Sequence, residues 1–209
     1  MADFGLERGC VREGCRVVAG VDEVGRGALC GPVVAAAVAF PLEAILSESS
    51  EWLARIDDSK RLTARLRGEL AGRIAAAAAV GIGCSPSGEV DRLNVLRASQ
   101  AAMRRAVAAL PVRPDLVLVD GLPLPEPGFP QKAVPHGDRI ATSIAAASIV
   151  AKVLRDALIV FSGRLLPGYG LARHKGYGTT AHYRALEALG PTPFHRRSFT
   201  LQSERTLFE

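Results

Sequence analysis

The sequence predicts an α/β fold built around one central β-sheet. Short apolar runs typical of strands alternate along the chain with longer segments whose apolar residues recur at helical spacing, as expected for helices packed on a sheet. The chain has 209 residues, of which 48% are hydrophobic and 22% charged. This is enough for one substantial core and too apolar for a disordered chain.

The first half of the chain is predicted to supply three strands and one helix. Residues 16–21 form an apolar run that leads into an acidic pair, and glycines with a proline then indicate a turn. Residues 33–40 are apolar at every position, so a second strand is expected here, buried on both faces. Thr63 is predicted to cap a helix that ends near residue 79, and a short strand follows over residues 80–83.

The second half is predicted to be mainly helical, with one further strand. Its predicted elements are a helix over residues 91–110 that Pro111 and Pro114 stop, a strand over 116–119 that ends at Asp120, a proline-rich loop over 123–130, and helices over 143–161 and 179–189. The sequence contains no repeat, low-complexity linker or clear domain boundary.

Basic residues concentrate toward the C-terminus. The formal net charge is +5, and residues 164–199 contain six lysines and arginines against Glu187 alone, interleaved with histidines and aromatic rings. Basic groups among rings suit phosphates and stacked sugars or bases, although a solvated arginine-rich surface would have the same composition. We expect residues 1–163 to form the core and residues 164–209 a basic, mainly helical extension of the same domain.

Neither a membrane protein nor a secreted one is expected. The longest apolar run, residues 33–40, is well short of the roughly 20 residues that a membrane span needs, and the N-terminus lacks a secretory pattern. We therefore predict a soluble cytoplasmic protein. The spacing of Cys10 and Cys15 would allow a zinc site, but no second Cys/His pair with finger spacing follows, so free thiols are the expectation.

Acidic residues stand at strand ends or at a loop-to-helix junction: Asp22 with Glu23, Asp120, and Asp138. Because burying an unpaired charge is costly, each either meets a basic residue or they gather around a cation, for which oxygen ligands indicate Mg²⁺ or Mn²⁺. In a regular strand Asp22 and Glu23 would point to opposite faces. We therefore expect them to share a site only if the strand ends or bulges there, which Gly25 would favour.

Several shorter patterns have two interpretations. Gly25-Arg26-Gly27 is followed by a glycine one residue too late for a dinucleotide fingerprint. Lys60, in an Asp-Ser-Lys turn, is either a phosphate contact or solvated. Tyr177 lies between two glycines, a pattern typical of a tight turn that presents a ring. The Ser148 hydroxyl is expected to bond back to the preceding turn of its own helix.

Together these motifs resemble the ribonuclease HII family. The matching segments, in order, are residues 21–27 (VDEVGRG), 31–38 (GPVVAAAV), 58–60 (DSK), 93–94 (LN), 101–103 (AAM), 119–121 (VDG), 137–138 (GD), 143–153 (SIAAASIVAKV), 155–156 (RD), 174–179 (HKGYGT) and 195–199 (HRRSF). The resemblance covers residues 16–199. The HKGYGT form and the HRRSF ending resemble the bacterial branch.

The resemblance implies a ribonuclease H-like fold, with a mixed five-stranded sheet flanked by helices and a helical C-terminal extension. It implies an endoribonuclease that hydrolyses the RNA strand of RNA–DNA hybrids and cuts on the 5′ side of single ribonucleotides in duplex DNA. The family's metal ligands fall on Asp22, Glu23, Asp120 and Asp138, which would bind two Mn²⁺ or Mg²⁺ ions during catalysis and leave 5′-phosphate and 3′-hydroxyl ends.

The resemblance also assigns substrate contacts. Gly25, Arg26 and Gly27 match the residues that recognise the 2′-hydroxyl at the junction between ribonucleotide and deoxyribonucleotide. Tyr177 matches the tyrosine that stacks on the adjacent deoxyribose, and Lys60 would contact phosphate. Val24 and nearby departures from the family pattern affect only the fine junction preference.

Two other functions are compatible with the same fold. One is a non-catalytic module that binds RNA–DNA hybrids, which the presence of all four carboxylates disfavours. The other is a metal-dependent nuclease for DNA junctions, which would have no obvious use for Tyr177. We expect a monomer, and we also consider docking of the tail, residues 202–209, on a replication clamp.

Overall fold

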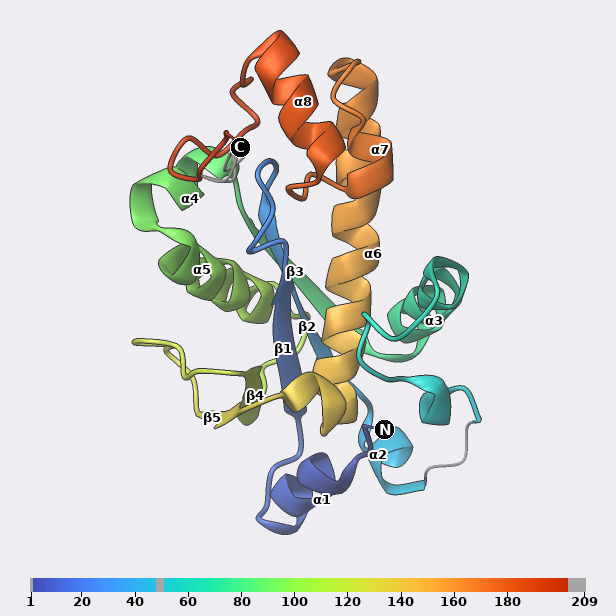
Figure 1. Cartoon of the computed structure of the whole chain (residues 1–209). Helices are drawn as coiled ribbons and strands as arrows, with labels where there is room; N and C mark the ends of the chain where they lie inside the picture. The colour runs from blue at the N-terminus through green and yellow to red at the C-terminus, as the bar shows by residue number, and fades with distance from the viewer. Residues whose placement is uncertain (1, 48–50, 203–209) are drawn as a thin grey trace, which may run out of the picture.

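The centre of the molecule is a mixed five-stranded sheet, shown in the computed structural model of Figure 1, which describes residues 2–47 and 51–202. The strand order is β3-β2-β1-β4-β5. The strands are β1 (Val18–Val24), β2 (Val33–Ala39), β3 (Ala79–Ser85), β4 (Leu116–Asp120) and β5 (Gln131–Val134). β2 runs antiparallel to both β1 and β3, whereas β4 runs parallel to β1 and β5 parallel to β4. The predicted α/β class and mixed sheet are confirmed.

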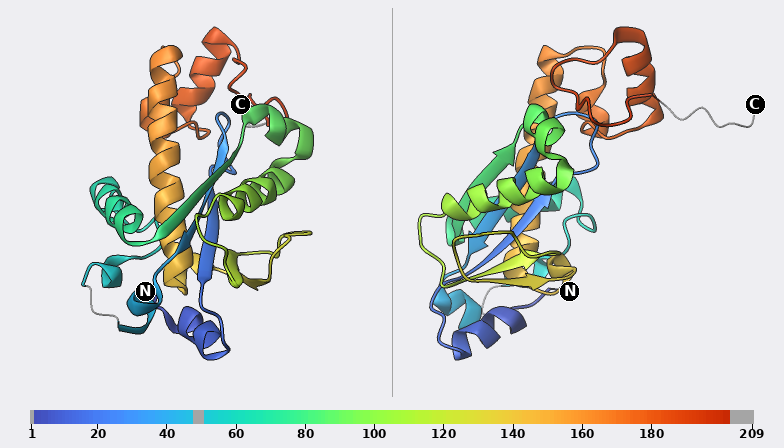
Figure 2. Two further views of the ribbon diagram at one scale, coloured as in Figure 1. Left: turned by 180° about the vertical axis from the view of Figure 1, so that it is seen from behind. Right: turned by 90° about the vertical axis from the view of Figure 1, so that its left-hand side faces the viewer.

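Two long helices cover opposite faces of the sheet, α6 (Thr142–Leu165) on one and α5 (Val95–Ala108) on the other (Figure 2). β2 is buried along its whole length, and its side chains divide between two hydrophobic clusters. Ala36 and Val38 pack with α6, while Ala35 and Ala37 pack with α5. The expectation that this strand is buried on both faces is therefore confirmed.

The other helical segments surround this three-layer centre. They are α1 (Gly5–Arg12), α2 (Leu42–Ser47), α3 (Ala64–Ala77), α4 (Ser87–Leu93), α7 (Leu171–His174), α8 (Thr180–Leu189) and the 3₁₀ turns η1 (Leu53–Arg55) and η2 (Gly137–Arg139). Thr63 caps α3 as predicted, because its hydroxyl accepts a hydrogen bond from the Leu66 amide at 3.3 Å. α1, α2 and β5 are additions to the elements identified from local patterns.

The prediction of a single helix over residues 91–110 is wrong in one respect. The structure has two helices there, α4 and α5, which are separated at Asn94. Asn94 has the positive φ of +69° with ψ of 164°, which no α-helix accommodates, and its side chain accepts a hydrogen bond from the Arg97 amide at 3.1 Å. Asparagine stabilises helix starts in this way, so Asn94 begins a new helix although the apolar spacing continues across it.

The chain after α6 folds back against the upper end of that helix, where α7 and α8 pack beside it (Figure 1). A small cluster joins this segment to the loop after β1 through Leu29, Cys30, Tyr169 and Leu186. α6 itself runs past residue 163, and the division expected there stays a prediction. All four cysteines are free thiols. Among the described helices, none combines the length and apolarity that a membrane crossing requires.

Candidate active site

Three of the four predicted metal ligands come from neighbouring parallel strands. Asp22 and Glu23 lie near the end of β1, and Asp120 is the last residue of β4. Asp138 lies in η2, and the amide of Gly137 beside it donates to the Asp120 carboxylate at 2.7 Å. The fold therefore brings all four predicted ligands to one end of the sheet.

Asp22 and Glu23 reach one site without a bulge, and β1 ends at Val24, one residue after Glu23, so the expectation that the strand ends or bulges at this pair is met by its end. β1 keeps a regular register with β2, in which Asp22 pairs with Ala36 and Glu23 with Ala35. On its other edge, β1 pairs with β4 only as far as Val21. The two side chains start on opposite faces of β1, but from Asp22 onward that edge is open, and both reach the same space beside it.

Gly20 explains how Asp22 comes so close to α6. A Cβ atom at Gly20 would lie 2.3 Å from the Ser143 carbonyl carbon and the Ile144 amide nitrogen, so only glycine lets the helix start this near the strand. Two residues later on the same face, Asp22 lies next to Ser148 of α6, which opposes part of the rise in its pKa. Because Gly20 has no side chain, α6 can approach the strand closely enough to lie beside the Asp22 carboxylate.

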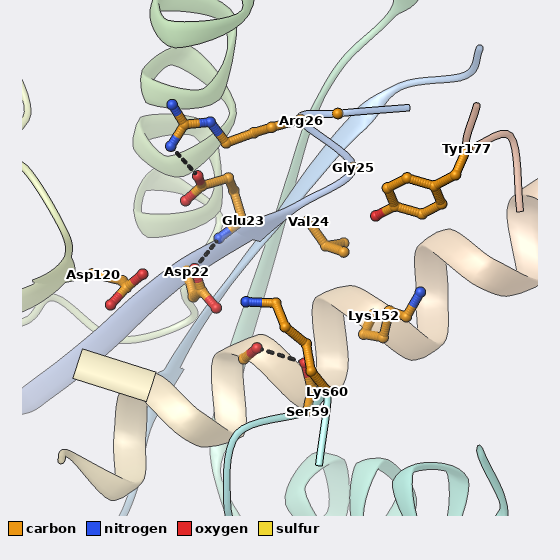
Figure 3. Close-up of a pocket in the computed structure, with 12 residues that line it drawn as sticks. Asp22, Glu23, Val24, Gly25, Arg26, Ser59, Lys60, Asp120, Lys152 and Tyr177 are labelled. Atoms are coloured by element: carbon orange, nitrogen blue, oxygen red, sulfur yellow. Dashed lines mark hydrogen bonds and ion pairs between the residues drawn. The ribbon is translucent and has the colours of Figure 1, made fainter. Parts of the chain in front are cut away.

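An open cavity of about 540 Å³ contains these groups (Figure 3). Asp22, Glu23 and Asp120 lie toward one end of it, and the ring of Tyr177 lies at the other. The remaining lining residues are Val24, Gly25, Arg26, Gly27, Ser59, Lys60, Ser148 and Lys152. The substrate contacts implied by the resemblance therefore share one cavity with three of the carboxylates, and Asp138 lies next to that set.

The carboxylates repel one another in a poorly solvated place. Burial raises the pKa of Asp22 well above its ordinary value, and the charges of Glu23 and Asp120 raise it further. Burial also raises the pKa of Glu23, while the Arg26 guanidinium, 3.1 Å from its Oε1, opposes that shift. The site thus concentrates negative charge that the nearby cations compensate only in part, a condition that favours binding of a divalent cation.

Asp138 and Lys60 face each other at the edge of the site, with Nζ of Lys60 3.9 Å from Oδ2 of Asp138. Burial raises the pKa of Asp138, and the charges of Asp120 and Asp58 add to the shift. The Lys60 side chain is 80% exposed. Its charge is therefore mostly solvated and offsets only part of the rise in the pKa of Asp138.

The loop that carries Gly25, Arg26 and Gly27 is held from below by two buried arginines that the sequence interpretation missed. Arg196 donates hydrogen bonds to the carbonyl oxygens of Gly25, Arg26 and Gly31 at 2.7 to 3.1 Å. Arg155 donates to the carbonyls of Pro32, Lys175 and Cys30. Both side chains are completely buried, so their guanidinium groups bind backbone carbonyl oxygens and are not available to a ligand.

Tyr177 is placed by the same arrangement. The Leu29 amide donates to the Gly176 carbonyl at 2.8 Å, and Ala28 forms a β-bridge with Tyr177. Lys152 lies 5.6 Å and Arg155 5.3 Å from the centre of the Tyr177 ring, within the range of cation–π contacts. The ring and the Gly25–Gly27 backbone are therefore parts of one connected surface.

Two serines contribute to the site in a way that the sequence interpretation did not anticipate. The hydroxyl of Ser148, on α6, lies 2.8 Å from that of Ser59, and Ser148 lowers the pKa of Asp22 beside it. The expectation that the Ser148 hydroxyl bonds back to the preceding turn of its own helix is wrong, because its partner is Ser59. Local patterns could not reveal this pair, because the two residues are 89 positions apart.

Comparison with known proteins places the chain among ribonucleases. A family model described as Ribonuclease HII matches residues 19–202. The chain is 52% identical over 201 residues to a curated Ribonuclease HII from Rhodospirillum rubrum, covering 95% of this chain and 89% of that protein. It is 47% identical over 200 residues to a Ribonuclease HII from Geobacter sulfurreducens, with 95% and 88% covered.

Solved structures share the fold. The ribonuclease H2 of Pyrococcus horikoshii matches with a TM-score of 0.70 at 24% identity, covering 88% of this chain and 94% of that one. A PCNA:RNase HII complex from Archaeoglobus fulgidus gives 0.70 at 24% identity, with 86% and 92% covered. Bst-RNase HIII in complex with Mn²⁺ gives 0.68 at 18% identity, with 88% and 67% covered. These likenesses confirm the expected ribonuclease H-like fold.

Proposed function

The chain belongs to the ribonuclease HII family, and from that premise we propose that its cavity is the active site of a metal-dependent endoribonuclease. The enzyme hydrolyses the RNA strand of RNA–DNA hybrids and cuts on the 5′ side of single ribonucleotides in duplex DNA. The observation that carries this proposal is the shared cavity, in which carboxylates at one end face a glycine loop and a tyrosine at the other.

The carboxylates fit Mg²⁺ or Mn²⁺. Asp22, Glu23, Asp120 and Asp138 offer hard oxygen ligands, and their mutual repulsion and burial, visible in the raised pKa values of three of them, are relieved by a divalent cation. We propose that they hold two ions at the scissile phosphate. Bound ions there would lower the pKa of the attacking water and stabilise the leaving 3′ oxygen, so that the products carry 5′-phosphate and 3′-hydroxyl ends.

The protein groups around the carboxylates select and position the substrate. The backbone of Gly25 and Gly27 can approach a sugar closely, and we assign it, with Arg26, to the 2′-hydroxyl that distinguishes RNA from DNA. Tyr177 would stack on the deoxyribose that follows. Lys60 would contact phosphate, which positions the duplex without reading its bases.

Incision of a labelled DNA duplex that contains one ribonucleotide tests this function. The duplex is incubated with Mg²⁺, with Mn²⁺ and with EDTA, beside an RNA–DNA hybrid and an all-DNA duplex. Metal-dependent cutting on the 5′ side of the ribonucleotide, with the all-DNA duplex intact, is expected. Cutting of DNA alone would indicate a DNA nuclease, and hybrid binding without cutting under either metal would indicate a binding module; each outcome contradicts the proposal.

The partner of the C-terminal tail is a separate question. The archaeal RNase HII named above was solved in complex with PCNA. Of residues 202–209, only Gln202 is among the described residues. We propose docking on a replication clamp as a function to test by deleting residues 202–209, which is expected to abolish clamp binding and to leave incision of short duplexes unchanged. Unchanged clamp binding in the truncated protein would contradict it. A monomeric, cytoplasmic enzyme remains the expectation.

A further inference from the structure

Two completely buried histidines lie directly beneath the Tyr177 loop. His182 comes from the first turn of α8 and His195 from the loop that follows that helix, and their Nε2 atoms are 3.1 Å apart. Neither residue lines the catalytic cavity. Buried imidazoles need defined hydrogen-bond partners, so the bonds of these two rings reveal what they do.

The hydrogen bonds determine which nitrogen of each ring carries the hydrogen. The backbone amide of Thr192 donates to Nδ1 of His195 at 3.1 Å, so the neutral His195 ring carries its hydrogen on Nε2. Nδ1 of His182 lies 3.0 Å from the carbonyl oxygen of Tyr177, which only accepts, so His182 carries its hydrogen on Nδ1. Nε2 of His195 therefore donates to Nε2 of His182. The result is one directional chain from Thr192 to the Tyr177 carbonyl.

The surroundings keep both rings neutral. Burial lowers the pKa of His182, and it lowers the pKa of His195 to about 4. His174 stacks on His182 at 4.3 Å, and Tyr169 contacts His195 at 5.1 Å. The buried guanidinium groups of Arg155 and Arg196 lie near Cys30, whose sulfur is itself close to both rings. Protonation of His182 would put a hydrogen on its Nε2, facing the Nε2–H of His195, and the hydrogen bond between the two rings would be lost.

These atoms are better suited to hydrogen bonding than to metal binding. Donor atoms of Cys30, His182 and His195 all lie within 4.8 Å of one another, a spacing that a metal ion could use. To bind a metal ion, Nε2 of His195 would need a free lone pair. It has none in the tautomer whose Nδ1 accepts from the Thr192 amide. The two buried guanidinium groups would also repel a dication.

The Tyr177 loop depends on such contacts for its shape. Lys175 and Gly176 both have positive φ values, 52° and 81°, and a lysine in this conformation is held there by its surroundings. The Leu29 amide fixes the Gly176 carbonyl from one side. His182 fixes the Tyr177 carbonyl from the other.

We propose that His182 and His195 are positioning residues for junction recognition, acting through the hydrogen-bond chain that ends on the Tyr177 carbonyl. The inference rests on the function proposed above, because it assigns the pair a role in how Tyr177 meets the deoxyribose. This chain of hydrogen bonds fixes the position of the Tyr177 ring relative to the carboxylates. Its loss is therefore expected to weaken the preference for single ribonucleotides more than it weakens cleavage of a uniform hybrid.

Substitutions of His182 test the proposal. His182→Phe keeps a ring that stacks on His174 but removes the donor to Tyr177. His182→Asn keeps an amide where Nδ1 stands and can still donate. Tyr169→Phe is the matched control, since it removes the hydrogen bond to the Gly190 carbonyl in the same packed segment but leaves the chain intact. The readout is the ratio of kcat/KM on the single-ribonucleotide duplex to kcat/KM on the hybrid, which a general loss of folded enzyme does not change.

We expect this ratio to fall about tenfold in His182→Phe, the effect of one positioning hydrogen bond. It should stay within about threefold of wild type in His182→Asn and in the control. In a Tyr177→Ala background, His182→Phe should lower the ratio of the two kcat/KM values no further. An unchanged ratio in folded His182→Phe, or an equal further loss without the Tyr177 ring, would overturn the proposal.

Nitrogen-15 NMR of the histidine rings in the wild-type protein tests the chain without any reference to activity. The expected tautomers are Nδ1–H on His182 and Nε2–H on His195, both neutral at pH 8. The opposite tautomers would overturn the proposal, as would loss of the His195 Nε2–H signal on addition of Zn²⁺, which would identify a metal site. If the wild type cuts neither substrate, the proposed function fails, and the NMR result still decides whether the chain exists.

Discussion

At the scale of single residues, the site is shaped by the cost of burying negative charge. Asp22 is 6% exposed and Asp138 is 7% exposed. The pKa of Asp22 is raised although it accepts a hydrogen bond from the Glu23 amide, and the pKa of Asp138 is raised although Lys60 and Arg139 lie near it. A folded protein keeps such an arrangement at the expense of its own stability. The metal-free protein should therefore reveal that cost directly.

Replacing Asp22 with Asn should stabilise the metal-free protein at pH 8. The amide removes a buried charge next to Glu23 and Asp120 while its oxygen can still accept from the Glu23 amide. An increase in the free energy of unfolding is expected, since folding then no longer has to bury that charge. Thermal unfolding in EDTA measures it, and Mn²⁺ should then raise the Tm of wild type more than that of the variant. A lower Tm for metal-free Asp22→Asn would contradict the electrostatic account.

Asp120→Asn should abolish catalysis with the fold and binding largely kept. The Asn oxygen can still accept from the Gly137 amide, so the local structure survives, but a charged oxygen ligand is lost. Turnover is expected to fall about 10²-fold or more, the scale for removing one group that stabilises charge in a transition state. Cleavage and hybrid-binding assays are compared in parallel. Retained turnover would remove Asp120 from the proposed metal site.

At the scale of elements, the catalytic loop depends on interactions from distant parts of the chain. The loop between β1 and β2 has few partners of its own, and the buried Arg196 supplies hydrogen bonds to three of its carbonyl groups from 165 to 171 positions away. Gly25 fits because it has φ of +95° and because a Cβ there would lie 2.1 Å from Nε of Arg155. The loop and the two arginines therefore form one structural unit.

Arg196→Lys should destabilise the protein strongly. A lysine cannot reproduce the planar fork that serves several carbonyls at once, and it leaves buried acceptors unpaired at a cost of roughly 1–3 kcal/mol for each group. A loss of about 3 kcal/mol in the free energy of unfolding is expected in urea. Arg197→Lys, at the exposed neighbouring position, is the control and should change stability by less than about 0.5 kcal/mol. Equal stability of the two variants would show that the carbonyl contacts contribute little.

At the scale of the whole molecule, the C-terminal segment that packs against the loop after β1 contains buried histidines that must stay neutral. The pKa of His195 is lowered to about 4 by burial, with the neighbouring His182 adding to the effect, whereas an unperturbed histidine titrates near pH 6.5. Between these values the unfolded chain binds more protons than the folded one. The stabilising contribution of the neutral ring is thus complete above about pH 6.5 and is lost as the pH falls toward 4.

The difference in unfolding free energy between wild type and His195→Asn isolates this effect, because the carboxylates titrate in both proteins. Wild type should be more stable than His195→Asn at pH 7. The difference in their free energies of unfolding should become smaller as the pH falls from 6.5 to about 4. Urea titrations at a series of pH values measure it. A gap that stays constant over this range would mean that His195 is not held neutral by the fold.

Much of the fold could be predicted from local sequence because the signals are local. The uniformly apolar run that became β2, the Thr63 cap and the strand ending at Asp120 each depend on residues close together in the chain. Short elements were missed for the same reason. β5 has only four residues and no strong alternation, and it exists because β4 offers it an edge. The continuous apolar spacing across Asn94 also hid a break that one backbone conformation decides.

The α/β class and the family could be recognised from the amino-acid sequence alone, and the four acidic residues could be predicted as site candidates, because ordered motifs and hydrophobic runs are properties of the chain. The tertiary structure decided how they meet. Asp22 and Glu23 share a site because β4 leaves the end of β1 unpaired, and Ser59 reaches Ser148 because α6 crosses the sheet there. Arg155, Arg196 and the two buried histidines acquire their partners only in the folded molecule, since those partners are backbone carbonyls and amides that sequence patterns do not place in space.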